Sequence, residues 1–501
     1  MRFTSLVVEL IRARPRLVVW ITVLAQAALW LILALILYRS PPGGVATLLA
    51  FGREYQVGTD LGPPLASWLA DIAFRAAGNH AFGVYLLAQI CSVATFLAIY
   101  QLGRAIVGGQ QAVLAVLLTM TVVVFSSPSL EFGPLILARP LWALLLLHSW
   151  RLIGQNRQNA WFAWSIEAGL LLLTTPTAIG MLLLVAAFTL ATARGRRMLV
   201  SLDPLYALLV VVVLALPYLI WLIRSDSFVT PPWPPIAELS ARGVRGGLLL
   251  GGLLAAMSGI VLLVILNSRW FARHADEAPI IYRPPVDPLA RKFVYFFAIA
   301  PAIAGSLVGG LFNLDRVVGG AGVALLMSGL AVIVASGDLI HLRRQRLLRS
   351  VWAAAIAAPA LVAIAATLLL PLTGTEVPTS LPAAQIANFF GDSFERRTNQ
   401  RLRAVAGDPQ LASLIAMDTG RPHLLLDATP QRTPWLTTGK IAETGGIVVW
   451  RASDTSGMPP ADIAQRFPGL VPEVPQAFEW LVNGRQPLLR IGWAIVRPKA
   501  P

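Results

Sequence analysis

Residues 17–38 read LVVWITVLAQAALWLILALILY, a run of 22 residues without a charged side chain. A helix needs about 20 apolar residues to cross the hydrocarbon core of a bilayer, because it rises only about 1.5 Å per residue. The run is therefore long enough to span a membrane. It lacks a small-residue cleavage site, so we expect it to stay in the protein as an anchor.

Further apolar runs follow along most of the chain, and the length criterion gives about eleven candidate spans. The chain is 56% hydrophobic and 13% charged, whereas a soluble globular protein carries about a quarter charged residues. These proportions predict a mainly α, polytopic membrane protein. The runs are Leu17–Tyr38, Phe82–Leu102, Ile106–Phe125, Pro134–Leu152, Ala160–Thr174, Thr177–Ala193, Leu205–Ile223, Gly246–Leu266, Phe293–Phe312, Val317–Ile340 and Val351–Leu372.

Basic residues are distributed unevenly between the loops. About 19 fall on every second loop, beginning with Arg2, Arg12, Arg14 and Arg16, against about 7 on the alternate loops. Cytoplasmic loops of membrane proteins carry the excess of Lys and Arg. We therefore predict a bacterial inner-membrane protein with a cytoplasmic N-terminus. An odd number of spans then places the C-terminal segment in the periplasm.

The net charge of +15 does not indicate nucleic-acid binding, because the arginines lie between apolar runs and form no basic amphipathic helix. The single cysteine, Cys91, can form neither an internal disulfide nor a cysteine-based metal site. The five histidines show no metal-binding spacing. We expect no metal ligand set and no definite cofactor. A divalent cation stays an open alternative, and the sequence does not give the oligomeric state.

The chain after the last apolar run alternates short apolar strands with helices. This pattern predicts a small, mostly parallel α/β domain over 376–501, next to a membrane domain over 1–375. A helix should begin after Asp408-Pro409 and run through Met417. We expect this domain to cover the external mouth of the membrane domain. Its predicted strands are Leu402–Val405, Leu424–Leu426, Ile447–Trp450 and Leu488–Val496.

The first external loop, 39–80, contains an amphipathic element. Pro63-Pro64 opens a run with Leu65, Trp68, Leu69 and Ile72 at helical spacing. Such a helix would lie in the plane of the membrane interface with its tryptophan at headgroup depth.

Acidic residues of this loop are the first candidates for chemistry. Glu54 and Asp60 lie close to the expected membrane surface, beside Arg53 and Tyr55. A carboxylate there can act as general base on a hydroxyl acceptor, while arginine stabilises a departing lipid phosphate. Two solvated loop carboxylates are the alternative interpretation.

Charged residues at membrane depth are the second candidates, because burying charge in lipid is expensive. Arg139 could meet a lipid phosphate, form an ion pair with Glu131 two turns away, or form an ion pair with another helix. Glu167 either forms a hydrogen bond to a neighbouring helix as a protonated carboxyl or acts in catalysis or transport. Asp338 lies near the cytoplasmic end of its run, where snorkelling to the interface explains it.

Several short motifs resemble those of bacterial GT-C glycosyltransferases, and more narrowly the protein-mannosyltransferase and aminoarabinose-transferase group. The first loop and a second stretch before the fourth run carry the resemblance, and the C-terminal segment is similar to the tail of alphaproteobacterial members. The motifs are REYQVG at 53–58, PPL at 63–65, WL at 68–69, EF at 131–132, RPLWA at 139–143, VAGD at 405–408, RP at 421–422, PW at 434–435 and GGIVVW at 445–450.

The resemblance implies a GT-C-like fold and a membrane glycosyltransferase. Such enzymes pass a sugar from a polyprenyl-phosphate donor to an envelope lipid, glycan or protein at the periplasmic face, lipopolysaccharide included. The implied catalytic base is Asp60 or Glu54 of the first loop. The implied substrate-binding residues are Arg53, Tyr55, Trp68, Glu131 and Arg139.

The chain also departs from the family pattern. The usual acidic pair of the first loop is replaced by Gly44 and Thr47, and the basic residue before Pro-Pro by Gly62. Whether the chain is an enzyme is therefore open. Either Asp60 or Glu54 has taken the role of base, or the chain is a degenerate scaffold that binds lipid-linked sugar or a partner. A lipid or solute transporter is the third alternative.

Overall fold

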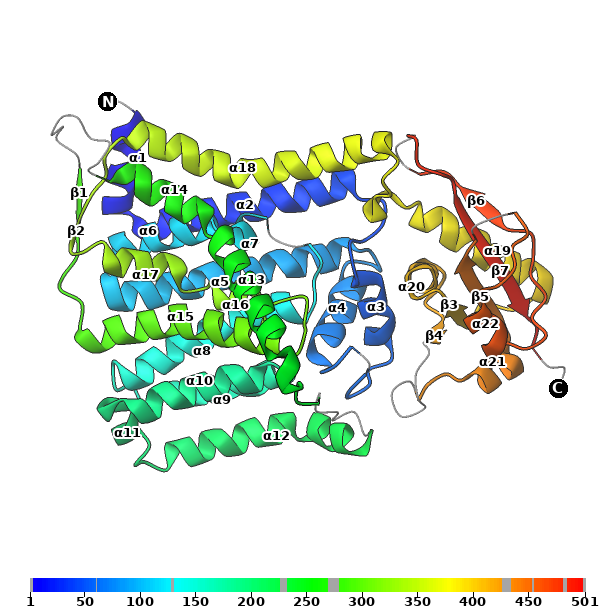
Figure 1. The fold of residues 1–501 in the computed structure, drawn as a ribbon, viewed down its shortest axis with the longest axis horizontal. Helices are drawn as coiled ribbons and strands as arrows, with labels where there is room; N and C mark the ends of the chain where they lie inside the picture. Colours follow the sequence, from blue (N-terminus) through cyan, green and yellow to red (C-terminus); the bar gives the residue numbers. More distant parts are fainter. Residues whose placement is uncertain are drawn as a thin grey trace.

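Long helices run side by side along the molecule, and a small sheet-containing part lies at one end. The computed structural model describes residues 3–59, 61–127, 130–225, 232–268, 279–425, 434–452, 455–480 and 484–498. Figure 1 places the N-terminus at the end opposite the C-terminal sheet. The arginine-bearing α1 (Phe3–Ala13) and α11 (Ala193–Met198) lie at that same end.

Six helices in the described part of the chain are long and apolar enough to cross a membrane. A seventh span results if α13 (Leu239–Ala256) and α14 (Ser258–Asn267), bent by 50°, count as one. Three shorter apolar helices follow the same direction in Figure 1: α6 (Gly109–Met120), α9 (Ala160–Leu172) and α10 (Ala178–Ala191). The multi-pass helical fold is confirmed, and the count of eleven stays a prediction. The six long helices are α2 (Pro15–Leu37), α5 (Phe82–Val107), α8 (Pro134–Ile153), α12 (Asp203–Arg224), α15 (Pro288–Leu311) and α18 (Gln345–Leu369).

One predicted span is not a single helix. Residues 317–340 form α16 (Ala321–Ala324), α17 (Ser328–Ala335) and the strand β2 (Leu339–His341). Glycines with positive φ interrupt this stretch at 319, 320 and 337. The strand pairs antiparallel with β1 (Ile280–Tyr282), a contact that the hydropathy of the run does not reveal.

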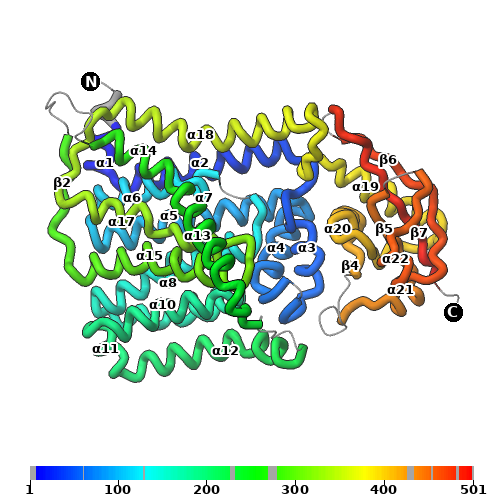
Figure 2. The backbone as a smooth tube through the Cα atoms, viewed as in Figure 1, coloured from blue at the N-terminus to red at the C-terminus, as the bar shows by residue number. Residues whose placement is uncertain are grey.

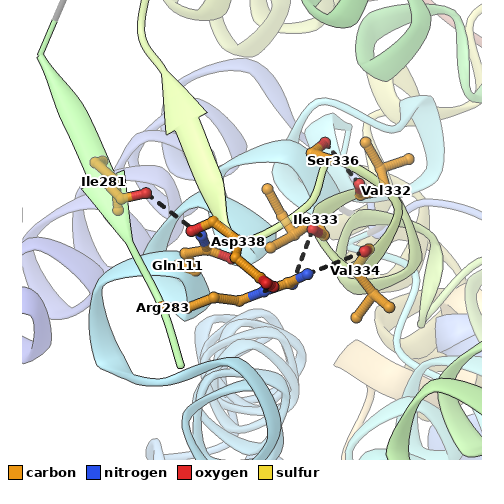
Figure 3. Close-up of polar contacts among 8 residues, drawn as sticks. All are labelled: Gln111, Ile281, Arg283, Val332, Ile333, Val334, Ser336 and Asp338. Atoms are coloured by element: carbon orange, nitrogen blue, oxygen red, sulfur yellow. Dashed lines mark hydrogen bonds and ion pairs between the residues drawn. The ribbon is translucent and has the colours of Figure 1, made fainter. Parts of the chain in front are cut away.

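A buried arginine holds this broken region together (Figure 3). The guanidinium of Arg283 donates hydrogen bonds to the carbonyl oxygens of Ile333 and Val334, at 3.1 and 3.2 Å, at the C-terminal end of α17. Its Nε lies 3.0 Å from Oδ1 of Asp338. A cation at a helix C-terminus is favourable because the last carbonyls have no partner within the helix. Asp338 lies near the end of the run, as expected, and it is also ion-paired with Arg283.

Two short helices form a layer between the long helices and the C-terminal sheet (Figure 1). They are α3 (Val45–Arg53) and α4 (Leu65–Ala76). The second confirms the predicted helix after Pro63-Pro64, and the first was not predicted. The two pack closely at Gly52, where a Cβ would lie 2.2 Å from the carbonyl oxygen of Ser67. A larger residue at 52 would push the helices apart.

The C-terminal part contains a five-stranded sheet in the order β4-β3-β5-β7-β6. The predicted helix is confirmed as α20 (Pro409–Asp418), since Oδ1 of Asp408 accepts the N–H groups of Gln410 and Leu411 at 2.9 and 3.0 Å. The expectation of a mostly parallel sheet is wrong. β3 pairs parallel with β4 and β5, but the β5–β7 and β6–β7 pairs are antiparallel. The strands are β3 (Ala404–Gly407), β4 (His423–Leu425), β5 (Gly446–Arg451), β6 (Gln476–Phe478) and β7 (Leu489–Val496).

The sheet is joined to the short-helix layer by a shared apolar core. Ala46 and Phe51 of α3 belong to the same buried cluster as residues of α20, β3 and β5. Phe51 is buried and meets Trp435 edge-on, with ring centroids 5.5 Å apart. Figure 2 shows α3 and α20 as neighbours. The domain boundary at 375/376 stays a prediction, because this core links both parts.

Candidate functional site

A carboxylate of the first loop contacts the C-terminal sheet. Glu54 follows the last residue of α3, and its Oε1 lies 2.7 Å from Nδ1 of His423, the first residue of β4. The Glu54 side chain is 9% exposed and that of His423 is 41% exposed. The pair therefore lies at the edge of the contact between the short-helix layer (α3 and α4) and the C-terminal sheet, which we call the junction. The histidine side chain is exposed to water. A hydrogen bond to imidazole orients a carboxylate, as a catalytic base requires.

The centre of the junction is a fully buried carboxylate, Asp71 on α4. It forms ion pairs with Arg75, at 2.8 Å, and with Arg421 from the segment before β4. Tyr55 donates its hydroxyl to Oδ2 of the same carboxylate at 2.8 Å. The Arg421 guanidinium also stacks over Phe74, 5.3 Å from the ring centroid. Buried charges are stable only when paired and hydrogen-bonded, and these partners meet that condition.

The aromatic residues of the loop form one packed group. The Tyr55 ring stacks on Trp68 at 6.4 Å with an interplanar angle of 28°. The Trp68 indole N–H donates to the carbonyl of Gln56 at 3.1 Å. Gly58 lies against Trp221 of α12, since a Cβ at 58 would fall 2.3 Å from that ring. The loop is therefore held between α4 and α12.

A basic pocket of about 680 Å3 opens where α3 meets the segments before β3 and β4. We call it the junction pocket. Nη1 of Arg53 is buried and has no hydrogen-bond partner in the described part of the chain. Burial lowers the pKa of the Arg53 guanidinium below its usual range; Glu54 opposes this, and the charges of Arg421 and Arg75 add to it. The pocket is lined by Arg53, Gln400, Arg401, Leu402, Arg403, Gly420, Arg421, Pro422 and His423.

Gly44 and Thr47, which stand where the family pattern has an acidic pair, have different surroundings. At Gly44, the backbone N–H donates to Oε1 of Glu131 at 3.1 Å. A carboxylate from a distant segment thus lies against the turn that begins α3. At Thr47, the hydroxyl lies 2.9 Å from Oγ of Ser413 on α20. Position 47 therefore contacts the C-terminal sheet region.

Arg139 lies in a separate place within α8. Its guanidinium stacks over Phe125 at 5.6 Å and lies 3.5 Å from the carbonyl of Val124. A Cβ at Gly322 would fall 2.3 Å from its Nε, so this glycine makes room for it. Among the described residues, no hydrogen bond or ion pair joins Arg139 to Glu54. Its proposed role in binding lipid phosphate stays a prediction.

The remaining predicted residues have mixed outcomes. Asp60 lies outside the described residues, so its candidacy stays a prediction. Glu167 is hydrogen-bonded to His148 of α8, with Oε1 2.8 Å from Nδ1, as the helix-pairing alternative predicted.

Among the described residues, no group of three or more His, Cys, Asp or Glu could hold a metal ion. The divalent cation stays a hypothesis.

Sequence reasoning missed three residues of the junction: Asp71, Arg421 and His423. Asp71 had a signal, since it stands in an amphipathic helix four residues before Arg75, on the face of Ser67 and Phe74. Arg421 belongs to the Arg421-Pro422 motif of the C-terminal resemblance, but neither Arg421 nor His423 could be linked to its partner, because the partners lie about 350 residues or more away in the sequence.

Comparisons with known proteins agree with this architecture. Residues 62–221 match the family model described as dolichyl-phosphate-mannose-protein mannosyltransferase. The crystal structure of ArnT from Cupriavidus metallidurans bound to undecaprenyl phosphate is 13% identical, with a TM-score of 0.59 over 96% of this chain and 99% of that chain. The chain therefore has the same overall fold as ArnT, the GT-C-like fold that the motifs predicted. ArnT in the apo state has a TM-score of 0.57 at 14% identity, covering 95% and 97% of the two chains. No curated protein matches the sequence.

The family model covers some of the candidate residues and leaves others outside its range. Trp68, Glu131 and Arg139 fall within the matched range 62–221. Arg53, Glu54 and Tyr55 precede it, as does Asp60. The GT-C fold expected from the first-loop motifs is confirmed.

Proposed function

We propose that the chain transfers a sugar from a polyprenyl-phosphate donor to an envelope lipid, glycan or protein. The observation that carries the proposal is the GT-C fold over nearly the whole chain, together with the mannosyltransferase match of residues 62–221. One of the structures with this fold, ArnT, is bound to undecaprenyl phosphate. A membrane-embedded fold suits a donor whose tail lies in lipid.

We place the reaction at the periplasmic face of a bacterial inner membrane, with the N-terminus in the cytoplasm. Two features support this orientation. The arginine-bearing α1 and α11 lie at the end of the molecule opposite the C-terminal sheet, and basic residues favour the cytoplasmic side. The C-terminal sheet and the short-helix layer then lie together outside the membrane.

The base in this proposal is Glu54, with Asp60 as the second candidate. Glu54 lies in the short-helix layer and is oriented by His423. It could take a proton from an acceptor hydroxyl, while Arg53 stabilises the negative charge of the leaving prenyl phosphate. Tyr55 and Trp68 give the loop a rigid aromatic wall for the sugar.

A specific observation favours a second candidate, a scaffold without catalysis. Thr47, which stands where the family usually has an acid, is hydrogen-bonded to Ser413, so this position serves docking of the C-terminal part. In that case the chain would bind a lipid-linked sugar or a partner enzyme and transfer nothing.

The test is transfer of labelled sugar from polyprenyl-phosphate donors to host envelope lipids in membranes. Wild type is compared with Glu54→Gln, Asp60→Asn and Glu131→Gln, and with Glu443→Gln as a surface control. Transfer that Glu54→Gln abolishes and Glu443→Gln retains supports the enzyme and its base. Donor binding without transfer from any donor, in wild type, would favour the scaffold.

A further inference from the structure

A cavity of about 400 Å3 lies between helices at the N-terminal end of the molecule. We call it the apolar cavity. Its walls come from α1, α2, α6, α14, α17, α18 and the strand β2. Figure 1 shows α1, α6, α14 and α17 together near the N-terminus, far from the C-terminal sheet. The apolar cavity is therefore separate from the candidate base and from the junction pocket.

The wall of this cavity offers little to a polar guest. Fifteen of its twenty lining residues are apolar. Two of the polar ones direct their hydroxyl groups onto their own helices. Thr22 donates to the carbonyl of Val18 at 2.9 Å, and Ser336 donates to that of Val332 at 2.8 Å (Figure 3). A cavity with apolar walls binds an apolar guest in preference to water.

One wall of the cavity is held in place by contacts outside it. Ile333 and Ile340 both line the cavity. Arg283 donates to the carbonyl of Ile333 at 3.1 Å, as Figure 3 shows, and Ile340 pairs with Ile281 of β1. A wall that is fixed in this way needs little reorganisation when a guest enters, which favours binding.

The size of the cavity suits a long hydrocarbon chain. A protein cavity of about 150 Å3 holds benzene, which has six carbons. By that ratio, 400 Å3 has room for about sixteen carbons, the length of a membrane acyl chain. Each buried methylene group contributes about fourfold to affinity, so a chain of this length binds well if its headgroup is accommodated.

Positive charge stands where the cavity meets the surface. Arg349 lines the cavity and is exposed. Nη1 of Arg343 lies 3.2 Å from the carbonyl oxygen of Asn267, another lining residue. The described residues that line the cavity include no Asp or Glu. Basic pockets between membrane helices bind the headgroups of anionic lipids, because guanidinium groups pair with phosphate.

We propose that the apolar cavity holds one acyl chain of an anionic phospholipid, whose phosphate contacts Arg349 and Arg343. The second chain stays in the bilayer. This lipid is neither donor nor acceptor, and the inference does not depend on the proposed function. A prenyl-phosphate donor fits the cavity poorly, because its phosphate has to reach α3, at the other end of the helices (Figure 1).

The experiment titrates lipids onto the purified full-length chain in detergent and counts bound lipids by native mass spectrometry. The probes are phosphatidylglycerol and phosphatidylcholine with the same palmitoyl and oleoyl chains, and undecaprenyl phosphate. Val264→Trp fills the cavity from α14. Its matched control is Val261→Trp, since the two valines are 45% and 49% exposed on one helix and only Val264 lines the cavity.

A second pair of variants tests the charge. Arg349→Gln removes a guanidinium from the rim, and Arg157→Gln removes an exposed one from the segment before α9, outside the cavity. The unfolding midpoint of each variant, measured without added lipid, shows whether it has folded.

The expected result is that the wild type binds phosphatidylglycerol about tenfold more tightly than phosphatidylcholine, since hydrogen bonds to charged groups are the strong ones. Val264→Trp should weaken phosphatidylglycerol binding by about tenfold or more, because the indole displaces several methylene groups. Arg349→Gln should remove most of the preference for phosphatidylglycerol. Val261→Trp and Arg157→Gln should bind as the wild type does.

Three outcomes would overturn the proposal. The first is equal phosphatidylglycerol affinity in Val264→Trp and Val261→Trp. The second is a wild type that binds both phospholipids equally, or binds neither. The third is undecaprenyl phosphate binding that Val264→Trp weakens as much as it weakens phosphatidylglycerol binding, since the cavity would then hold the donor's tail.

Discussion

Nδ1 of His423 and Oε1 of Glu54 lie 2.7 Å apart, although the two residues are 369 positions apart in the sequence. The contact joins the first loop to the first residue of β4, so the candidate base is positioned by the C-terminal part of the chain. A carboxylate that is 9% exposed and held by imidazole differs from a freely solvated loop carboxylate. This geometry favours Glu54 over the alternative of an unconstrained acidic residue.

Glu54→Gln should lower sugar transfer by about 10²–10⁴-fold, because the amide keeps the shape of the side chain but cannot accept a proton. Radiolabelled transfer in membranes measures the effect. Glu443→Gln, an exposed carboxylate on α21 (Thr438–Thr444), is the control and should transfer at the wild-type rate. Full activity in Glu54→Gln, with loss in Asp60→Asn, would move the base to Asp60.

The turn before α3 offers a matched glycine pair. Gly43 has φ +56°, and a Cβ there would fall 1.8 Å from Oε1 of Glu131, whereas a Cβ at Gly44 meets nothing within 4 Å. Gly43→Ala should therefore lower the free energy of unfolding by about 1–3 kcal/mol, from backbone strain and displacement of Glu131. Gly44→Ala should cost less, up to about 1 kcal/mol, because Gly44 is the N-cap of α3, where alanine is disfavoured but meets no clash.

Thermal unfolding of both variants in the same detergent measures this difference. Equal stability of the two variants would mean that Glu131 does not lie against this turn.

The sequence predicted the parts of the fold that depend on composition and local pattern. Apolar runs such as 17–38 identify their helices because lipid demands about 20 apolar residues from each span. The cap at Asp408-Pro409 identifies α20 because the signal is local. By contrast, 317–340 is as apolar as a span but is broken. Its glycines at 319, 320 and 337 adopt positive φ, and Ile340 pairs with Ile281 of another strand, and neither feature follows from the hydropathy of the run.

For the same reason, the sequence identified only some of the residues that meet between the first loop and the C-terminal sheet, and their roles stay predictions. Glu54, Arg53 and Tyr55 were identified from the first loop, where charge and aromatic residues cluster. Their partners His423 and Arg421 come from the far end of the chain, and no local pattern connects them. Residues that act through long-range contacts need a structure to be found.

Phe51→Ala should weaken the attachment of the C-terminal part. Phe51 is 1% exposed and packs edge-on against Trp435, so its removal leaves a cavity in the shared core. Loss of a buried phenylalanine costs about 3–5 kcal/mol. The measurement is the rate of limited trypsin cleavage after Lys440 and Arg451, which should rise in the variant.

Phe162→Ala is the control for this change, because Phe162 is 72% exposed on α9. It should be cleaved at the wild-type rate. Unchanged cleavage of Phe51→Ala would show that the C-terminal sheet is held by other contacts.

Asp71→Asn should strongly lower the free energy of unfolding. The carboxylate is fully buried and neutralises Arg75 and Arg421 while accepting the Tyr55 hydroxyl. An amide of the same shape leaves Arg421, which is 14% exposed, without a counter-charge. Removing one partner of a buried ion pair costs about 3–5 kcal/mol. Asp462→Asn breaks an exposed pair with Arg466 and should cost less than about 1 kcal/mol. Unfolding midpoints of both variants in the same detergent separate the two cases, and equal midpoints would show that Asp71 is not the buried centre of the junction.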